Sequence, residues 1–139
     1  MRIMAIDYGD AHTGVAISDP TGFMTGYAAV IDAYRPEAVA QQIHTLAREY
    51  GVEELVLGHP INMDGSRGPR SEKAHAMKAL LEELTSLPVV LWDERRTTID
   101  AHQILMNNGK NAKKRKKTVD AVAASLILEG YLTFKKSRM

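Results

Sequence analysis

The first 19 residues, MRIMAIDYGDAHTGVAISD (1–19), decide the fold of the chain. An apolar run over Ile3–Tyr8 contains a single acid, Asp7, near its end. The chain then turns at Gly9 and resumes as a second apolar run over Thr13–Ser18. Two strand-like runs separated by a short turn predict a β-hairpin. A carboxylate at the end of a buried strand is costly without a partner, so the hairpin raises the question of what Asp7 binds.

The pattern downstream of this hairpin predicts a third strand and then alternating helices and strands. We expect a third strand between Met24 and Ile31, a helix from Pro36 that Gly51 ends, and short strands over Glu54–Gly58 and Val89–Asp93. Further helices are expected on the apolar face Ala74, Met77, Leu80, Leu81 and Leu84, from the capping box at Thr97 to about Met106, and over Thr118–Phe134. This order predicts an α/β fold with a mixed sheet and helices on both faces.

Length and composition describe an ordinary globular chain. Its 139 residues predict one domain over 1–139, with 45% hydrophobic and 25% charged residues. The absence of cysteine excludes disulfides and thiolate chemistry. No apolar run approaches the roughly 20 residues of a membrane span, and the first residues lack the basic start of a signal peptide. We therefore expect a cytoplasmic protein without a membrane partner.

Three acidic positions are candidates for metal chemistry. Asp7 ends the first strand, Asp93 and Glu94 end the last, and Asp120 lies one turn into the expected final helix. Ligand sites of α/β sheets gather beyond the carboxyl ends of the strands, so we expect these carboxylates to converge. Converging carboxylates need a cation, and oxygen ligands without a His or Cys cluster suit Mg²⁺ or Mn²⁺. Two such ions activate water and stabilise the leaving oxygen in phosphodiester cleavage.

Each acid also has a structural interpretation that the sequence leaves open. Asp7 could cap its own turn, Glu94 could pair with Arg95 or Arg96, and Asp120 could cap the last helix. Their convergent positions, beside a basic segment, favour the metal site over three separate structural roles.

Positive charge is concentrated in the last part of the chain. Residues 110–139 carry nine Lys or Arg against two Asp or Glu, and the remainder of the chain is acidic. We expect a basic loop in NNGKNAKKRKK (107–117), whose cations would neutralise phosphates without reading sequence: Lys110, Lys113, Lys114, Arg115, Lys116 and Lys117. Arg95 and Arg96 are further candidates, because a guanidinium can fork onto phosphate. The alternative is a solvated charge run, but its adjacency to Asp120 favours a nucleic-acid partner.

The loop HPINMDGSRGPR (59–70) is expected near the same site, with Asp64, Gly65 and Arg67 as its polar and flexible positions. His59 opens this loop and could serve as a proton shuttle or contribute only polarity.

Four blocks of the chain resemble the YqgF/RuvX family in the expected order: IDYGDAHTGVAISD, GHPINMDGSRGP, WDERRTT and KKRKKTVDAVAASLILEGYL. The resemblance implies a ribonuclease-H-like fold, with a three-stranded meander and two parallel strands added beside its first strand. It also implies Asp7, Glu94 and Asp120 as catalytic metal ligands, with Asp93 less certain. The family is described as a Holliday junction resolvase or as a nuclease that matures the 5′ end of pre-16S rRNA.

The chain departs from the family pattern at two places. Ala11-His12-Thr13 stands where the family usually has a basic pair, and Gly58-His59-Pro60 replaces the usual Gly-Leu-Pro. The loss of a permanent charge at His12 is expected to alter phosphate positioning or to make it pH-dependent.

These observations predict a Mg²⁺- or Mn²⁺-dependent endonuclease, acting first on pre-16S rRNA and, as the alternative, on Holliday junctions. The Holliday junction role predicts a homodimer that cuts two symmetric strands, and the sequence leaves open whether the chain is a monomer or a homodimer. Two further classes stay open: a nucleic-acid-binding module without catalysis, and a phosphotransfer enzyme of the sugar-kinase type. The last normally needs two such domains, for which 139 residues have no room.

Overall fold

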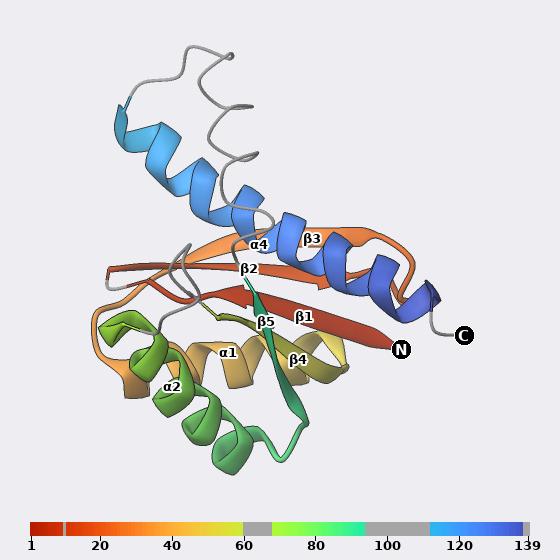
Figure 1. Ribbon diagram of the computed structural model, residues 1–139, viewed down its shortest axis with the longest axis horizontal. Coiled ribbons are helices and arrows are strands. Elements are labelled where there is room, and N and C mark those ends of the chain that lie inside the picture. Colours follow the sequence, from red (N-terminus) through yellow and green to blue (C-terminus); the bar gives the residue numbers. More distant parts are fainter. Residues whose placement is uncertain (10, 60–67, 94–111, 138–139) are drawn as a thin grey trace.

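The residues that the structure describes form a mixed sheet of five strands, in the order β3-β2-β1-β4-β5 (Figure 1). The computed structural model describes residues 1–9, 11–59, 68–93 and 112–137, the last group without the side chains of 112–120. The strands are β1 (Arg2–Asp7), β2 (His12–Ser18), β3 (Thr25–Asp32), β4 (Val52–His59) and β5 (Val89–Asp93). β1, β2 and β3 pair antiparallel, whereas β4 is parallel to β1 and β5 is parallel to β4. The predicted meander with two parallel strands beside its first strand is confirmed.

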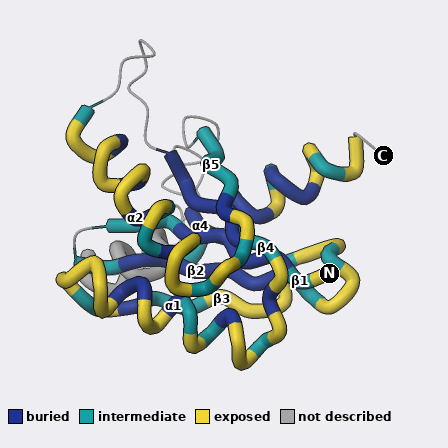
Figure 2. The backbone as a smooth tube through the Cα atoms, turned by 90° about the horizontal axis from the view of Figure 1, so that it is seen from below, coloured by how far each residue is buried: buried dark blue, intermediate teal, exposed yellow. Residues whose placement is uncertain are grey.

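Helices cover both faces of this sheet, as predicted. α1 (Pro36–Tyr50) and α2 (Pro69–Thr85) pack on one face, where Met4, Ile6 and Leu57 join a buried cluster with both helices. α4 (Ala112–Ser137) packs on the other face against a second cluster that includes Ile3 and Ala5. The buried residues accordingly concentrate in the central strands and on the inner sides of the helices (Figure 2). We call these the α1/α2 face and the α4 face.

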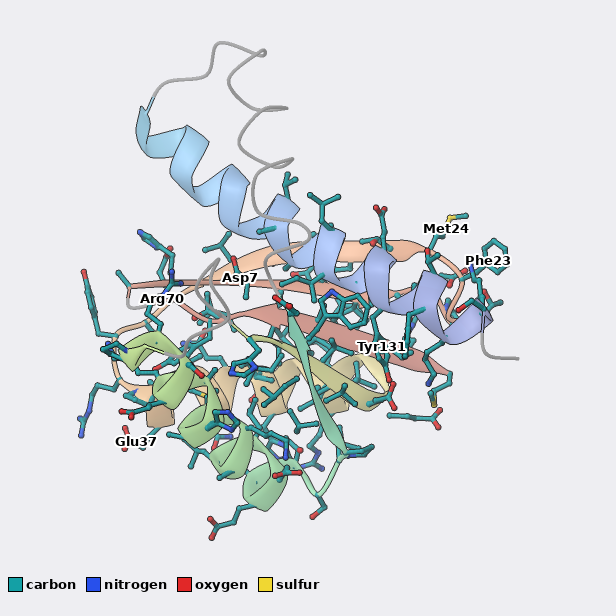
Figure 3. All side chains as sticks on the ribbon, in the orientation of Figure 1. Asp7, Phe23, Met24, Glu37, Arg70 and Tyr131 are labelled. Atoms are coloured by element: carbon teal, nitrogen blue, oxygen red, sulfur yellow. The ribbon has the colours of Figure 1, made fainter. Side chains whose placement is uncertain are left out.

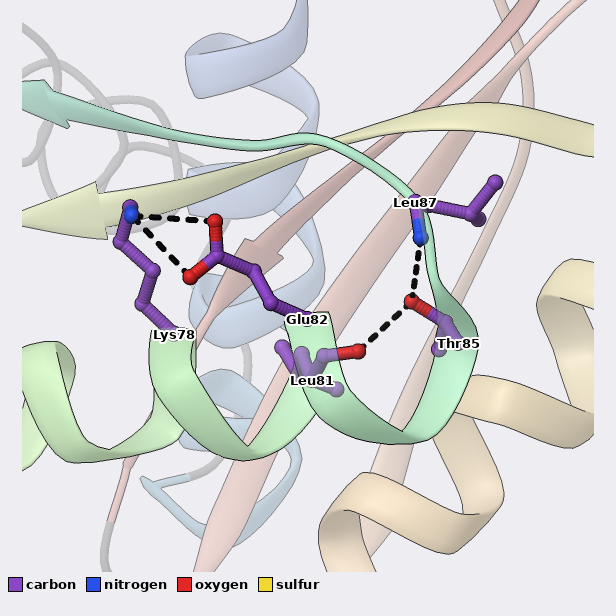
Figure 4. Close-up of polar contacts among 5 residues, drawn as sticks. All are labelled: Lys78, Leu81, Glu82, Thr85 and Leu87. Carbon is purple, nitrogen blue, oxygen red and sulfur yellow. Dashed lines mark hydrogen bonds and ion pairs between the residues drawn. The ribbon is translucent and has the colours of Figure 1, made fainter.

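The ends of α1 and α2 follow from local chemistry. Both helices begin with a proline, whose missing N–H costs nothing at the first helical position. Gly51 ends α1 with a left-handed φ of 67°, a conformation that glycine adopts without strain. At the end of α2, the Thr85 hydroxyl donates to the Leu81 carbonyl at 2.7 Å and accepts from the Leu87 N–H at 3.1 Å (Figure 4). These bonds fix the direction in which the chain enters β5.

The final helix begins earlier than the sequence pattern predicts. α4 starts at Ala112, so positions 113–117 of the expected basic loop belong to a helix. The physical reason is that Lys and Arg have high intrinsic helix propensity, and neither Gly nor Pro occurs between Ala112 and Asp120. The expected helix from Thr97 to Met106 lies outside the described residues. None of the described helices combines the length and the apolar run that a membrane crossing requires.

Candidate nuclease active site

Asp7 lies at the edge of the sheet where three parallel strands end. Ile6 pairs with Leu57, and His59 pairs with Asp93, so β1, β4 and β5 reach this edge together. The side chain is half-buried at the end of β1 (Figure 3). In the part of the chain that the structure describes, no group forms a hydrogen bond or an ion pair with its carboxylate. The alternative that Asp7 caps its own turn therefore finds no support in the described residues.

The Asp7 side chain belongs to the α4 face of the sheet. Side chains alternate between faces along a strand, and Ile3 and Ala5 pack in the cluster that contains α4. Met4 and Ile6 belong to the opposite cluster. The period of two therefore places the carboxylate on the α4 face.

Two glycines flank Asp7 on that face. Gly14 of β2 is its direct partner in the antiparallel register. On the other side, the register Ile6 to Leu57 brings Gly58 of β4 level with Asp7, on the same face as Val56. Residues paired across strands point to the same face, so a side chain at either position would stand beside the carboxylate. The two glycines place no side chain of their own beside the carboxylate, a feature that the sequence analysis missed.

Asp93 lies on the opposite face. In β5, Val89 and Leu91 pack with the α1/α2 cluster, whereas Val90 and Trp92 pack with the α4 cluster. The alternation thus assigns Asp93 to the α1/α2 face, away from the Asp7 carboxylate. The structure thus places Asp7 and Asp93, both of which the sequence left as possible metal ligands, on opposite faces of the sheet.

Asp7 and Gly9 are separated by one residue, and Gly9 allows the tight hairpin that follows the carboxylate. A Cβ at this position would overlap the carbonyl oxygen of His12. Any residue other than glycine at position 9 would therefore force the turn to shift away from the His12 carbonyl oxygen. The turn sends β2 back beside β1 and sets the register that places Gly14 opposite Asp7.

His12, at the departure from the family pattern, stands on the same face as Asp7. It lies two residues before Gly14 in β2, one diagonal position from the carboxylate. Its Nδ1 lies 2.5 Å from Oδ1 of Asp32, its partner in β3. The imidazole is thus held against β3 by a carboxylate, beside the proposed site.

α4 runs antiparallel to β1 and brings position 120 toward the strand ends. Near its C-terminus, the Lys135 ammonium lies 3.2 Å from Glu54 in the first part of β4, so the helix N-terminus heads toward the other end of the sheet. Helical spacing puts position 120 on the same side of α4 as Ala123, Ala124 and Ile127, which are buried against the sheet. Asp120 lies more than two turns into α4, so it does not cap the helix. Its side chain lies outside the described part of the chain.

Several expected site residues fall outside the description. Glu94, Arg95, Arg96 and Lys110, together with the loop positions Asp64, Gly65 and Arg67, lie outside the described residues. Lys113, Lys114, Arg115, Lys116 and Lys117 are placed in α4 by their backbone alone. Among the described side chains, no group of three metal-ligating residues is found. The predicted ligand set, Asp7 included, stays a prediction.

His59 points to the α1/α2 face, like Leu55 and Leu57 two positions apart along β4. It is 5% exposed, and its Nε2 lies 2.6 Å from the Oγ of Ser71, which is itself buried. Its ring also meets that of His75 edge to face, with centroids 4.9 Å apart. This placement favours packing of β4 against α2 over a proton shuttle beside Asp7.

A family profile described as "RuvX: Holliday junction resolvase" matches residues 1–134. The chain belongs to the RuvX family. Similar proteins carry the name "Putative pre-16S rRNA nuclease": one from Halothermothrix orenii is 46% identical over 96% of each chain. Another, from Pelotomaculum thermopropionicum, is 44% identical over 95% of this chain and 86% of its own. RuvX family membership makes the protein a nuclease.

Solved structures support the same fold for this RuvX member. A RuvC of T. thermophilus, in complex with a Holliday junction substrate, aligns with a TM-score of 0.64 over 99% of this chain and 96% of its own, at 14% identity. The Holliday junction resolvase of fowlpox virus aligns with a TM-score of 0.53 at 18% identity, over 99% of each chain. At these identities the likeness concerns the fold, and it confirms the predicted ribonuclease-H-like class.

Asp7 and its flanking glycines fit a hard divalent cation. A carboxylate supplies the oxygen ligand that Mg²⁺ and Mn²⁺ prefer, and Gly14 and Gly58 place no side chain of their own beside it. Divalent-metal dependence is in keeping with this fold class in general.

Proposed function

We propose that the protein is a Mg²⁺- or Mn²⁺-dependent endonuclease that matures the 5′ end of pre-16S rRNA. The observation that carries this proposal is the Asp7 carboxylate, half-buried, without a partner among the described residues and flanked by two glycines at the ends of parallel strands. The proposed substrate follows the names of relatives that are 46% and 44% identical over nearly the whole chain.

Glu94 and Asp120 are the proposed companions of Asp7. Glu94 directly follows Asp93, the last residue of β5, and β5 ends at the same edge of the sheet as Asp7. Position 120 approaches the same edge from α4, on the helix side that packs against the sheet. Asp93 is excluded from the proposed set, because it lies on the α1/α2 face.

In this proposal the chain supplies binding and orientation. Asp7 would hold its cation at the edge of the sheet, with Glu94 and Asp120 completing an oxygen-only ligand set. When bound, the cation supplies activation of water and stabilisation of the leaving oxygen. The cations at positions 110 and 113–117, with Arg95 and Arg96, would hold the phosphate backbone in place.

The decisive experiment measures cleavage of an RNA carrying the 5′ precursor segment of 16S rRNA. Asp7→Asn is expected to lower the cleavage rate at least about a hundredfold, because removing even an outer partner of a metal ligand costs 10- to 100-fold. Asp93→Asn is the matched control and is expected to leave the rate unchanged, since this carboxylate lies on the other face. Equal rates for the wild type and Asp7→Asn would refute the proposed site.

The same assay distinguishes substrates. A four-way DNA junction and a single-stranded RNA without the precursor sequence are offered under identical metal conditions. Selective cutting of the precursor RNA supports the maturation role. Symmetric cutting of the junction with no cleavage of the RNA would contradict the proposed substrate and assign the protein to DNA recombination.

A further inference from the structure

A groove of about 500 Å³ lies on the α1/α2 face, beside the end of β1. Its volume falls within the range of roughly 300–1,000 Å³ that is usual for small-ligand sites. Residues from three places line it: Tyr8 after β1, Tyr34, Pro36 and Glu37 at the start of α1, and Lys73, Ala76, Met77 and Leu80 on α2. It therefore has an apolar floor, two aromatic rings and one residue of each charge.

The groove adjoins the proposed active site across the end of the sheet. Tyr8 follows Asp7 directly, and it packs against the α1/α2 cluster while Asp7 belongs to the opposite face. Consecutive Cα atoms are about 3.8 Å apart, so the groove at Tyr8 and the proposed active site at Asp7 are adjacent along the backbone. Figure 3 places Asp7, Glu37 and Arg70 at the same end of the molecule. A chain bound at Asp7 could pass over this end of the sheet and enter the groove.

Tyr34 gives the groove an accessible aromatic surface. Tyr34 is 80% exposed, far more than the half-buried Tyr8, which also lines the groove. An aromatic ring left in water beside an apolar floor is a platform on which an unpaired base can stack. Phe23 and Met24, two other exposed large apolar residues, lie at the β2–β3 turn at the other end of the molecule (Figure 3).

The charges at the groove match a nucleotide. Lys73 lines it, and the exposed Arg70 lies three residues earlier on α2, so the two cations are neighbours on one helix side. Arg35, also exposed, follows Tyr34 directly. Three cations beside a stacking surface suit a base with its phosphates, and the Glu37 carboxylate can accept N–H groups from the edge of the base.

We propose that this groove binds an unpaired nucleotide of the nucleic-acid substrate, with Tyr34 stacking on the base and Lys73 contacting its phosphate. The inference rests on the proposed nuclease function, because it makes the groove a second contact for the strand held at Asp7. It also assigns base stacking to a chain in which aromatic residues are only 6% of the total.

Binding is tested with the full chain and a short single-stranded RNA in Ca²⁺, so that cleavage does not enter the measurement. Tyr34→Ala is expected to weaken binding about 5- to 150-fold, the equivalent of the 1–3 kcal/mol that one stacked base contributes. Tyr34→Phe keeps the ring and is expected to bind like the wild type. Phe23→Ala removes an exposed ring at the other end of the molecule and serves as the matched control.

A second readout reports stacking directly. An RNA that carries 2-aminopurine at successive positions is expected to lose fluorescence at one position on binding, and Tyr34→Ala is expected to restore that signal. Unchanged affinity and unchanged fluorescence in Tyr34→Ala would overturn the proposal. Tighter binding of AMP than of the RNA would also overturn it, because the groove would then be a site for free nucleotides.

Cleavage is scored separately, so the two proposals fail in different ways. One outcome is that the wild type cleaves, Asp7→Asn does not, and Tyr34→Ala binds RNA with full affinity. This outcome would refute the proposed role of the groove and support the nuclease proposal. The opposite outcome is that Tyr34→Ala loses affinity for RNA while the wild type cleaves nothing. It would support the proposed role of the groove and refute the proposed precursor substrate.

Discussion

The buried pair of His59 and Ser71 gives a prediction in which two damaging substitutions repair each other. The Nε2 and Oγ atoms are 2.6 Å apart, and the residues are 5% and 1% exposed. Ser71→Ala removes the hydroxyl and leaves the buried Nε2 without this partner, which costs about 1–3 kcal/mol. His59→Leu, the residue that the family pattern usually has here, leaves the buried Oγ unpaired at a similar cost.

The double variant removes both polar atoms, and its loss is expected to be smaller than the sum of the two single losses by about 1–3 kcal/mol. At about 4 °C per kcal/mol for a domain of this size, Ser71→Ala lowers Tm by about 4–12 °C. The assay is urea and thermal unfolding of all four proteins, followed by circular dichroism. The edge-to-face contact of His59 with His75 is lost in both variants that carry leucine, so the comparison cancels it.

Ser125→Ala is the control for the loss of a serine hydroxyl. The Ser125 Oγ donates to the Ala121 carbonyl within α4 at 3.1 Å and is only half-buried. Its removal is expected to change stability by no more than about 0.5 kcal/mol. Additive losses for His59→Leu and Ser71→Ala, within about 0.3 kcal/mol, would refute the reasoning, because the two atoms would then not depend on each other.

Three further predictions concern single positions. The Phe23 N–H and the Thr21 hydroxyl donate to the Asp19 carboxylate and hold its pKa below the ordinary 3.8. This lowered pKa stabilises the fold above about pH 4, so the stability advantage of the wild type over Asp19→Asn should vanish in acid titrations; an advantage that persists would contradict it. Gly51→Ala should cost about 1–2 kcal/mol of stability through the left-handed φ of 67° alone, since a Cβ there meets no atom within 4 Å and so adds no steric clash. Gly51→Asn should cost less, because asparagine tolerates this conformation better. Equal stability of all three proteins in urea unfolding would count against this prediction. Burial and a hydrogen bond to Glu54 raise the pKa of Tyr131 to about 12. The raised pKa contributes folding stability that is complete below pH 10 and is lost between pH 10 and pH 12. Tyr131→Phe should therefore lose less Tm than the wild type across that alkaline window, and identical losses would exclude the assigned pKa.

The fold was predictable from the sequence where hydrophobic pattern and turn residues agree. The β1–β2 hairpin, the helix from Pro36 and the short strand β4 all combine an apolar pattern with Pro or Gly at a boundary. The start of α4 was not predictable from the same signals. The lysine run has the charge pattern of a solvated loop, and this pattern hides its strong helix propensity.

The site was predictable only at the level of residue type and strand end. Asp7 stands out because it interrupts an apolar strand. Gly14 and Gly58 could not be recognised as its neighbours, because strand register depends on pairing between segments far apart in the sequence. The face of Asp93 was equally hidden: VVLWD is apolar at four successive positions, so its sequence shows no alternation to read.

The position of the first turns of α4 depends on how its later turns pack against the sheet. The helix is fixed to the sheet by Ile127, Leu128 and Leu132, while its first turns project past the strands (Figure 1). Position 120 lies about 18 Å from Leu132 at roughly 1.5 Å per residue, so a tilt of about 5° there displaces it by about 1.5 Å. A displacement of about 1 Å at a catalytic group can cost a hundredfold in rate. Given the proposed role of Asp120, repacking Leu132 is therefore expected to change the cleavage rate by displacing position 120, without touching substrate or metal.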